Sequence, residues 1–129
     1  MKINYHNSTK ALGPYSSAVE VILDTNRTLY VSGQGTIDQA TGQKYLGDIK
    51  KQAFIALSNM KEVIERSGFS MTDVIKITIY LTNIEEFNVV NVVYSQFFIK
   101  DKYPARTTIE VSALPGGHSI SIDAIAIKK

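Results

Sequence analysis

Apolar side chains alternate with polar ones over residues 74–82, and this period of two predicts a half-buried strand. The alternation places four apolar residues on one face of that strand: Ile75, Ile77, Ile79 and Leu81. Two further segments, 18–23 and 28–32, are rich in β-branched residues. Because residues 24–27 between them are turn-forming, these two segments predict a hairpin.

Two stretches with apolar side chains at helical spacing predict two helices. Asp48 can cap the first helix, and Gly68 stands where a left-handed residue would end it. The apolar positions between them are Ile49, Ala53, Leu57, Met60 and Ile64. Asn83, followed three positions later by Glu86, is typical of a second helix start. We expect its apolar stripe to face the core, and this stripe consists of Phe87, Val90, Tyr94 and Phe97.

The remaining segments complete an α+β pattern. Residues 106–112 and 119–127 predict two more strands joined by a turn at 114–117, and residues 33–47 form a long polar excursion. The chain shows no internal repeat or linker, which predicts a single domain over residues 1–129. We expect a two-layer sandwich in which both helices pack on one face of a mixed sheet.

Composition narrows the classes of function. A chain of 129 residues buries only about two-thirds of its unfolded surface, so an oligomeric interface would add stability. The net charge is +2 and no basic run exceeds a lysine pair, which argues against dedicated nucleic-acid binding. The absence of cysteine excludes disulfides and thiolate sites. Without an apolar leader or a membrane-length apolar stretch, the sequence favours a cytoplasmic protein with no membrane partner.

Motifs for metal binding or nucleophilic catalysis are missing from the sequence. His6 and His118 lie far apart with no third ligand at metal spacing, so we expect exposed polar histidines and no metal. Ser32 lacks the glycine two positions before it that a nucleophile elbow requires. The two glycines of Val-Ser-Gly-Gln-Gly at 31–35 do not extend to a phosphate-binding fingerprint.

Arg106 is a candidate for binding chemistry. It follows Pro104-Ala105, where the proline restricts the chain at the entrance of a strand. A guanidinium can bind a carboxylate through two parallel hydrogen bonds, but the spacing alone favours an ordinary surface ion pair with an acidic neighbour. We expect Tyr80, Arg106 and Thr108 on the sheet face away from the helices, where a subunit interface could use them.

Five segments, in order and over nearly the whole length, resemble the reactive-intermediate deaminase (Rid, or YjgF) family. They are Gly-Pro-Tyr-Ser at 13–16, Val-Ser-Gly-Gln at 31–34, Asn-Val-Val-Tyr at 91–94, Pro-Ala-Arg-Thr-Thr-Ile-Glu-Val at 104–111 and Ile-Asp-Ala-Ile-Ala at 122–126. The resemblance implies a chorismate-mutase-like fold, assembled as a homotrimer with clefts between neighbouring subunits. It also implies hydrolysis of 2-imino acids, such as 2-iminobutanoate and 2-iminopropanoate, to 2-keto acids and ammonia without a cofactor.

The same resemblance assigns roles to particular residues. Arg106 would bind the substrate carboxylate, and the backbone around Thr108, which replaces a cysteine common at that position, would add hydrogen bonds. Four further residues stand at motif positions that shape the cleft: Tyr15, Ser32, Gly33 and Asn91. An imine conjugated to a carboxylate already hydrolyses in water, so a protein that binds, orients and delivers water would suffice.

The last strand departs from the family pattern. Deaminase members typically read Ile-Glu-Ile-Glu-Ala-Ile-Ala, whereas residues 120–126 read Ile-Ser-Ile-Asp-Ala-Ile-Ala, so Ser121 replaces the glutamate that orients water. A serine hydroxyl can hold a water molecule but cannot take its proton at neutral pH without a neighbouring base. Asp123 lies about 6–7 Å further along the same face, and for it we expect a pairing or interface role.

Three functions therefore stay open. The first is an imine deaminase of altered efficiency or substrate, with Arg106 and Ser121 as its catalytic residues. The second is a non-catalytic trimer that binds a small carboxylate. The third, an endoribonuclease or translation inhibitor, follows from older family labels, but the sequence has neither an aromatic-interleaved basic stretch nor a histidine pair for RNA cleavage.

Overall fold

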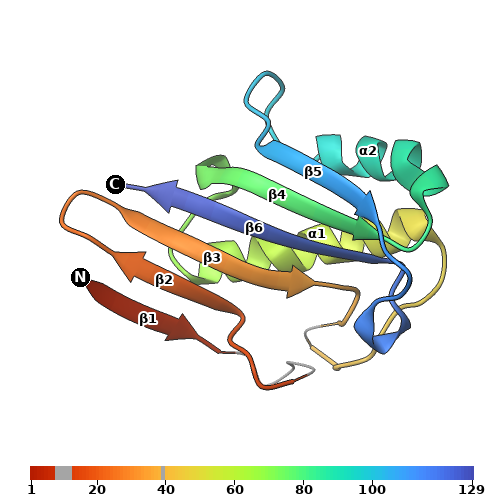
Figure 1. Cartoon of the computed structure of the whole chain (residues 1–129), viewed down its shortest axis with the longest axis horizontal. Helices are drawn as coiled ribbons and strands as arrows, with labels where there is room; N and C mark the ends of the chain where they lie inside the picture. Colours follow the sequence, from red (N-terminus) through yellow and green to blue (C-terminus); the bar gives the residue numbers. More distant parts are fainter. Residues whose placement is uncertain (8–12, 39) are drawn as a thin grey trace.

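The protein is a mixed α+β fold of two layers, seen in a computed structural model that describes residues 1–7, 13–38 and 40–129 (Figure 1). Six strands form one sheet, and helices α1 and α2 pack together against one of its faces. In chain order the elements are β1 (Lys2–His6), β2 (Ala18–Ile22), β3 (Arg27–Gln34), α1 (Ile49–Arg66), β4 (Val74–Leu81), α2 (Phe87–Ser95), β5 (Ala105–Glu110) and β6 (Ile120–Lys128), with short 3-10 turns at Met71–Asp73, Ile84–Glu86 and Pro115–Gly117.

The sheet has the strand order β1-β2-β3-β6-β4-β5. Strands β4 and β5 are parallel because α2 returns the chain across the sheet between them, and the other described pairs are antiparallel. The mixed sheet and the hairpin of β2 and β3 confirm the sequence prediction. Strand β1 was not predicted. It is a five-residue edge strand with three polar residues, too short for its alternation to stand out.

Side-chain caps start α1 and the 3-10 turn that precedes α2. At α1 the Asp48 carboxylate accepts hydrogen bonds from the backbone N–H groups of Lys50 (2.9 Å) and Lys51 (3.4 Å), and Gly68 adopts φ +86° just beyond its end, as predicted. Asn83, predicted to start the second helix, instead caps the 3-10 turn Ile84–Glu86, because its side chain accepts from the N–H of Glu85 at 3.0 Å; α2 then begins at Phe87 without a side-chain cap. No helix in the described ranges is both long enough and apolar enough to span a membrane.

The prediction for Ile75 was wrong. Opposite β6, the register of β4 shifts between Val74 and Lys76, so one extra residue bulges out of the pairing. A bulge reverses which face the neighbouring side chains occupy. Val74, before the bulge, and Ile77, after it, are therefore both buried, whereas Ile75 is 49% exposed.

The predicted positions of Arg106 and Thr108 on the sheet face away from the helices, the outer face, were also wrong. Residues paired across neighbouring strands point to the same face, and β5 pairs Arg106 with Ile77 and Thr108 with Ile79. Both isoleucines are fully buried in the core beneath the helices. Of the three residues, only Tyr80 lies on the outer face. Which side chains of β5 face the helices depends on its register with β4, and the sequence alone does not give that register.

The core fills the space between the sheet and the helices. Its fully buried apolar side chains include Leu29, Leu57, Met60, Ile64, Ile77, Ile79, Leu81, Ile120 and Ile122. Truncating such a side chain to alanine typically costs about 2–5 kcal/mol, a large part of the stability of a small domain. Substitutions that test function therefore belong at exposed or half-buried positions.

A buried carboxylate stabilises the β1–β2–β3 edge. Glu20 is 1% exposed and forms ion pairs with Arg27 and with His6, the latter at 3.3 Å, while the Arg27 guanidinium lies 5.2 Å from the centroid of the Phe69 ring. Burial by itself raises the pKa of Glu20, but hydrogen bonds from Arg27 and His6, together with the charge of Arg27, hold it below its ordinary value. Through Arg27, which contacts both Glu20 and Phe69, this edge of the sheet is linked to the loop after α1.

Glu20→Gln is expected to lower the free energy of unfolding at pH 7 by about 1–3 kcal/mol, because Arg27 loses its charged partner. A lowered folded-state pKa gives stability that is present above the unfolded pKa and lost as pH falls through the folded one. Denaturant unfolding at pH 7 and in the acidic range below about pH 4 would therefore show a smaller acid loss in Glu20→Gln. Equal losses in both proteins would contradict this account.

Candidate functional site

Arg106, near the start of β5, is held by one face of helix α2. Its guanidinium carbon lies 4.7 Å from the centroid of the Tyr94 ring and 5.4 Å from that of Phe87. Its Nη2 donates a 2.6 Å hydrogen bond to Oδ1 of Asn91. Residues 87, 91 and 94 recur at helical spacing, so α2 brings all three contacts to the same place. The guanidinium is therefore fixed by two rings and an amide.

This guanidinium has no acidic partner in the part of the chain that the structure describes. The ion pairs found there join Glu20 to His6 and Arg27, and Glu62 to Arg66. The neighbouring phenol does not supply an anion either, because burial raises the pKa of Tyr94 to about 12, against the opposing influence of the Arg106 charge. The positive charge of Arg106 is therefore available to an anion from outside the described chain.

Two buried hydroxyls lie on the same side of the sheet as Arg106, the side that faces the helices. Thr108 follows two residues after Arg106 on the helix-facing side of β5, and its Oγ1 is buried without a hydrogen-bond partner among the described residues. The hydroxyl of Tyr94 has the same property. Buried hydroxyls normally find partners, so each one adds unused hydrogen-bonding capacity near the guanidinium.

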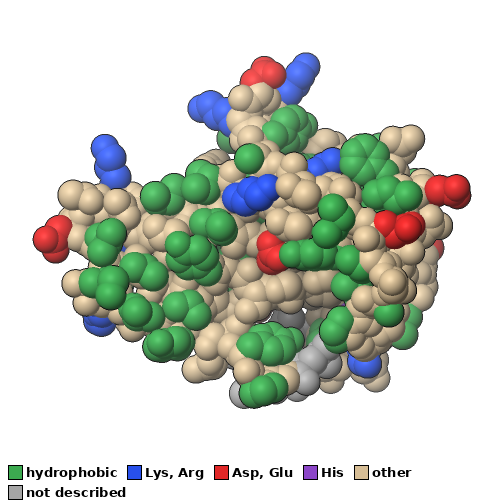
Figure 2. All heavy atoms as spheres, in the orientation of Figure 1, with side chains coloured by type: hydrophobic (Ala, Val, Ile, Leu, Met, Phe, Trp, Pro, Cys, Tyr) green, Lys and Arg blue, Asp and Glu red, His purple; other side chains and the backbone are tan. Residues whose placement is uncertain are grey.

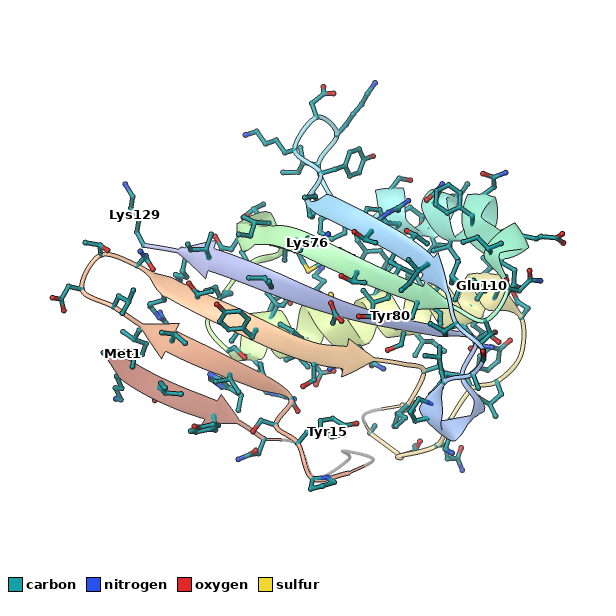
Figure 3. All side chains as sticks on the ribbon, in the orientation of Figure 1. Met1, Tyr15, Lys76, Tyr80, Glu110 and Lys129 are labelled. Carbon is teal, nitrogen blue, oxygen red and sulfur yellow. The ribbon has the colours of Figure 1, made fainter. Side chains whose placement is uncertain are left out.

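The other candidate residues form a second group, at the end of β3 and the start of β6. Ser32 donates through Oγ to the carbonyl of Ser16 at 2.6 Å. Gly33 lies where the register of β3 against β6 shifts, and a Cβ on it would be only 2.8 Å from Oγ of Ser121. The close approach of β3 to Ser121 therefore depends on a glycine at this position. Tyr15, 48% exposed, precedes β2 near this end of the sheet (Figure 3).

The two groups lie on opposite sides of the sheet. Ser121 pairs with Tyr80 across β6 and β4, so it shares the outer face, while Arg106 faces the helices. Within one chain, the structure thus brings Asn91 and Thr108 to Arg106, but it does not bring Ser121 there. Figure 2 views the outer face and shows apolar side chains gathered over its β1, β2 and β3 side.

Asp123 has a partner on the outer face. The hydroxyl of Tyr80 donates to its Oδ2 at 3.0 Å, and Figure 3 places Tyr80 on β4 beside the middle of β6. The hydrogen bond to Asp123 is the main cause that raises the pKa of Tyr80, with burial and the carboxylate charge adding to it. The predicted pairing role of Asp123 is confirmed.

The histidines lie in separate places, but one expectation about them was wrong. His6 contacts Glu20 at the sheet edge, whereas His118 is 5% exposed rather than exposed. It is buried because Gly35 and Gly116 lie against its ring and its Nδ1 is 2.7 Å from Oγ1 of Thr36. Burial, then the charge of Lys44, lowers the pKa of His118. Among the described residues no group of three or more His, Asp and Glu side chains could hold a metal.

A hollow of about 530 Å³ lies on the helix layer between α1 and the segment after β3. It is lined by Thr36, Asp38, Ala40, Gln43, Lys44, Tyr45, Lys51, Phe54, Ile55, Ser58, Asn59 and Glu62, so none of the candidate residues contributes to it. Several of its polar atoms already have partners. The Asp38 carboxylate accepts from two backbone N–H groups and the Asn59 amide donates to two carbonyls. The unpaired guanidinium of Arg106 is the better candidate site.

Sequence reasoning found Arg106 and Asn91 but not the ring contacts. Phe87 and Tyr94 were assigned to the core because they fit an apolar stripe, yet Phe87 is 38% exposed. The signal was the spacing, since both residues share a helical face with Asn91. A stripe that mixes aromatic residues with an asparagine differs from a purely apolar core stripe.

The fold and the site define a class of small α+β protein with an unpaired arginine at the edge of a mixed sheet. Residues 5–128 match the family model described as endoribonuclease L-PSP. The chain belongs to this family, which is the Rid family that its motifs resemble.

Curated relatives and solved structures resemble this chain over most of its length. The human protein named 2-iminobutanoate/2-iminopropanoate deaminase is 44% identical over 92% of this chain and 82% of its own length. A RutC family protein of Pyrococcus horikoshii is 42% identical over 95% and 94% of the two chains. The solved structure of E. coli TdcF with bound serine matches with a TM-score of 0.82 and 32% identity, covering 97% of this chain and 94% of that one. The name of the human relative supports a deaminase-like activity.

Proposed function

We propose that the protein hydrolyses small 2-imino acids to 2-keto acids and ammonia, with Arg106 binding the substrate carboxylate. The observation that carries this proposal is the Arg106 guanidinium, which is fixed by Asn91 and two aromatic rings yet has no acidic partner among the described residues. A fixed and unpaired guanidinium is suited to a planar carboxylate, which it can bind through two parallel hydrogen bonds.

The chemistry asks little of the protein. A water oxygen adds to the imine carbon and one of its protons moves to the nitrogen. The second proton then moves from the new hydroxyl to the nitrogen as the carbon–nitrogen bond breaks, leaving the keto group and ammonia. Binding of the substrate carboxylate by Arg106 neutralises its charge and holds the imine carbon in one place for attack. No cofactor takes part, and the buried hydroxyl of Thr108 can donate to the ligand.

A second copy of the chain would complete the site. Ser121 and Gly33 lie on the outer face or at its end, on the side of the sheet opposite Arg106, so one small ligand would not contact both groups of a single chain. A closed homotrimer would place the Arg106 group of one subunit against the Ser121 group of the next. The apolar side chains on the outer face support burial of that face between subunits.

A non-catalytic carboxylate-binding role is the alternative. It is favoured by Ser121, because a serine hydroxyl cannot take a proton from water at neutral pH without a base, and the nearby Asp123 carboxylate already accepts a hydrogen bond from Tyr80. An endoribonuclease role has less support, since the two histidines serve Glu20 and Thr36 rather than forming a pair.

The test couples an amino-acid dehydratase, which releases 2-iminobutanoate, to the purified protein in the presence of semicarbazide. Semicarbazide traps the imine, so a deaminase is expected to lower the amount of semicarbazone in proportion to its concentration. Unchanged semicarbazone over a wide range of protein concentration would contradict hydrolysis. Calorimetric binding of 2-oxobutanoate in that case would establish the non-catalytic alternative.

A further inference from the structure

Within the part of the chain that the structure describes, the contacts of Arg106 leave most of its N–H donors unused. A guanidinium carries five N–H groups, and Asn91 accepts from one of them, on Nη2. The two rings contribute differently, because an aromatic face attracts a cation without accepting an N–H donor in the way that a carboxylate would. Phe87 and Tyr94 therefore stabilise the charge of Arg106 while they leave its remaining N–H groups for a ligand.

The environment of Tyr94 keeps this arrangement intact. Tyr94 is 4% exposed, and its ring also contacts Phe98 at a centroid distance of 4.7 Å and Tyr103 at 6.2 Å. These contacts fix the ring from the side of the core. A phenolate beside Arg106 would neutralise the guanidinium from within the chain, but the pKa of Tyr94 is raised by burial to about 12, so the hydroxyl stays protonated in ordinary buffers.

Phe87 occupies the solvent side of the same guanidinium. It is the first residue of α2 and is 38% exposed, so its ring is not needed to fill the core. Phe54 on α1 is also an exposed ring of the helix layer, but it contacts Phe97, at a centroid distance of 5.6 Å, while the described rings against Arg106 are Phe87 and Tyr94. The position of Phe87 is therefore better explained by its contact with the Arg106 cation than by packing in the core.

We propose that Phe87 and Tyr94 are positioning residues, which orient the Arg106 guanidinium for a carboxylate and thereby give the site its preference for anionic over neutral ligands. The proposal rests on the proposed function, because it assumes that Arg106 binds the carboxylate. The positioning role and the proposed function can be told apart by measurement. Loss of a ring should weaken carboxylate binding but leave the contacts to the rest of the ligand in place.

The test measures the Kd of 2-oxobutanoate and of its methyl ester by calorimetry, together with imine hydrolysis. We would compare wild type with Phe87→Leu, Tyr94→Leu and Tyr94→Phe. The matched control is Phe54→Leu, the same change at an exposed ring of the same layer. Circular dichroism and thermal unfolding identify any variant that does not fold, and Phe87→Leu carries the test if Tyr94→Leu is one of these.

Phe87→Leu is expected to weaken 2-oxobutanoate binding about 3-fold and Tyr94→Leu about 10-fold, with little change for the ester. Tyr94→Phe should stay near wild type, because it keeps the ring, and KM for imine hydrolysis should rise more than kcat falls. Equal losses for acid and ester, or unchanged acid binding in both leucine variants, would overturn the positioning role while the proposed function stands. Failure of wild type to prefer the acid would overturn both.

Discussion

Replacement of Arg106 with alanine is expected to lower kcat/KM for imine hydrolysis by about 100-fold or more. Among the described residues, the groups around the substrate carboxylate would then be two rings, an amide and buried hydroxyls, without a charge to offset its loss of hydration. The measurement is the semicarbazone assay with purified variant. Binding of 2-oxobutanoate should disappear from calorimetry in the same protein.

Two further variants separate charge from geometry. Arg106→Lys keeps the positive charge but not the planar fork, so we expect it to recover only part of the binding. Arg66→Ala removes an exposed arginine that pairs with Glu62 at 3.3 Å on helix α1, and it should leave activity unchanged. Hydrolysis that survives in Arg106→Ala would show that the carboxylate is bound elsewhere.

Arg106→Ala also tests whether two chains share one site. Gly33→Val would disrupt the second group of candidate residues, around Ser121, because even a Cβ at position 33 would lie within 2.8 Å of Oγ of Ser121. Each variant alone is expected to be inactive. Coexpressed in equal amounts, they would form some interfaces with an intact Arg106 and an intact Gly33, and activity would return to about a quarter of the wild-type value in a closed oligomer. No recovery in confirmed mixed oligomers would contradict a shared site.

The elements that sequence predicted well are those whose signals are local. Asp48 and Gly68 bracket α1 because a carboxylate cap and a left-handed residue act within one turn of the chain. The hairpin between β2 and β3 follows from a turn-forming tetrapeptide in the same way. By contrast, Ile75 was misplaced because a bulge depends on the partner strand, which lies some fifty residues later in the chain.

The site was harder to predict because it depends on the faces of strands. The motifs named Arg106 and Asn91, and their 2.6 Å hydrogen bond joins them as a common site requires. Their side of the sheet could not be inferred, since it is set by the pairing of Arg106 with Ile77 across two parallel strands. The burial of His118 was missed for a similar reason, because Gly35, which packs on its ring, comes from a distant loop.

Ser121→Glu is expected to raise kcat for imine hydrolysis, by up to about 100-fold, if water attack limits the rate. The side chain at this position extends from the outer face beside Gly33, where a longer chain meets no Cβ. A carboxylate there can take the proton of an attacking water, which serine cannot do. Asp123, two residues along the same face, would raise the pKa of the introduced carboxylate toward a value that suits a general base.

The matched control is Ser121→Gln, which has the same length and hydrogen-bonding shape but no basic oxygen. It should show no gain in kcat, and only Ser121→Glu should gain a rise of kcat with pH through the pKa of a carboxylate, since the deprotonated form is the active one. Equal gains from both variants would assign the effect to water positioning. If wild type is active and Ser121→Glu is slower, the attacking water is held by groups other than residue 121. The reaction would then tolerate a serine in place of the family's glutamate on this strand.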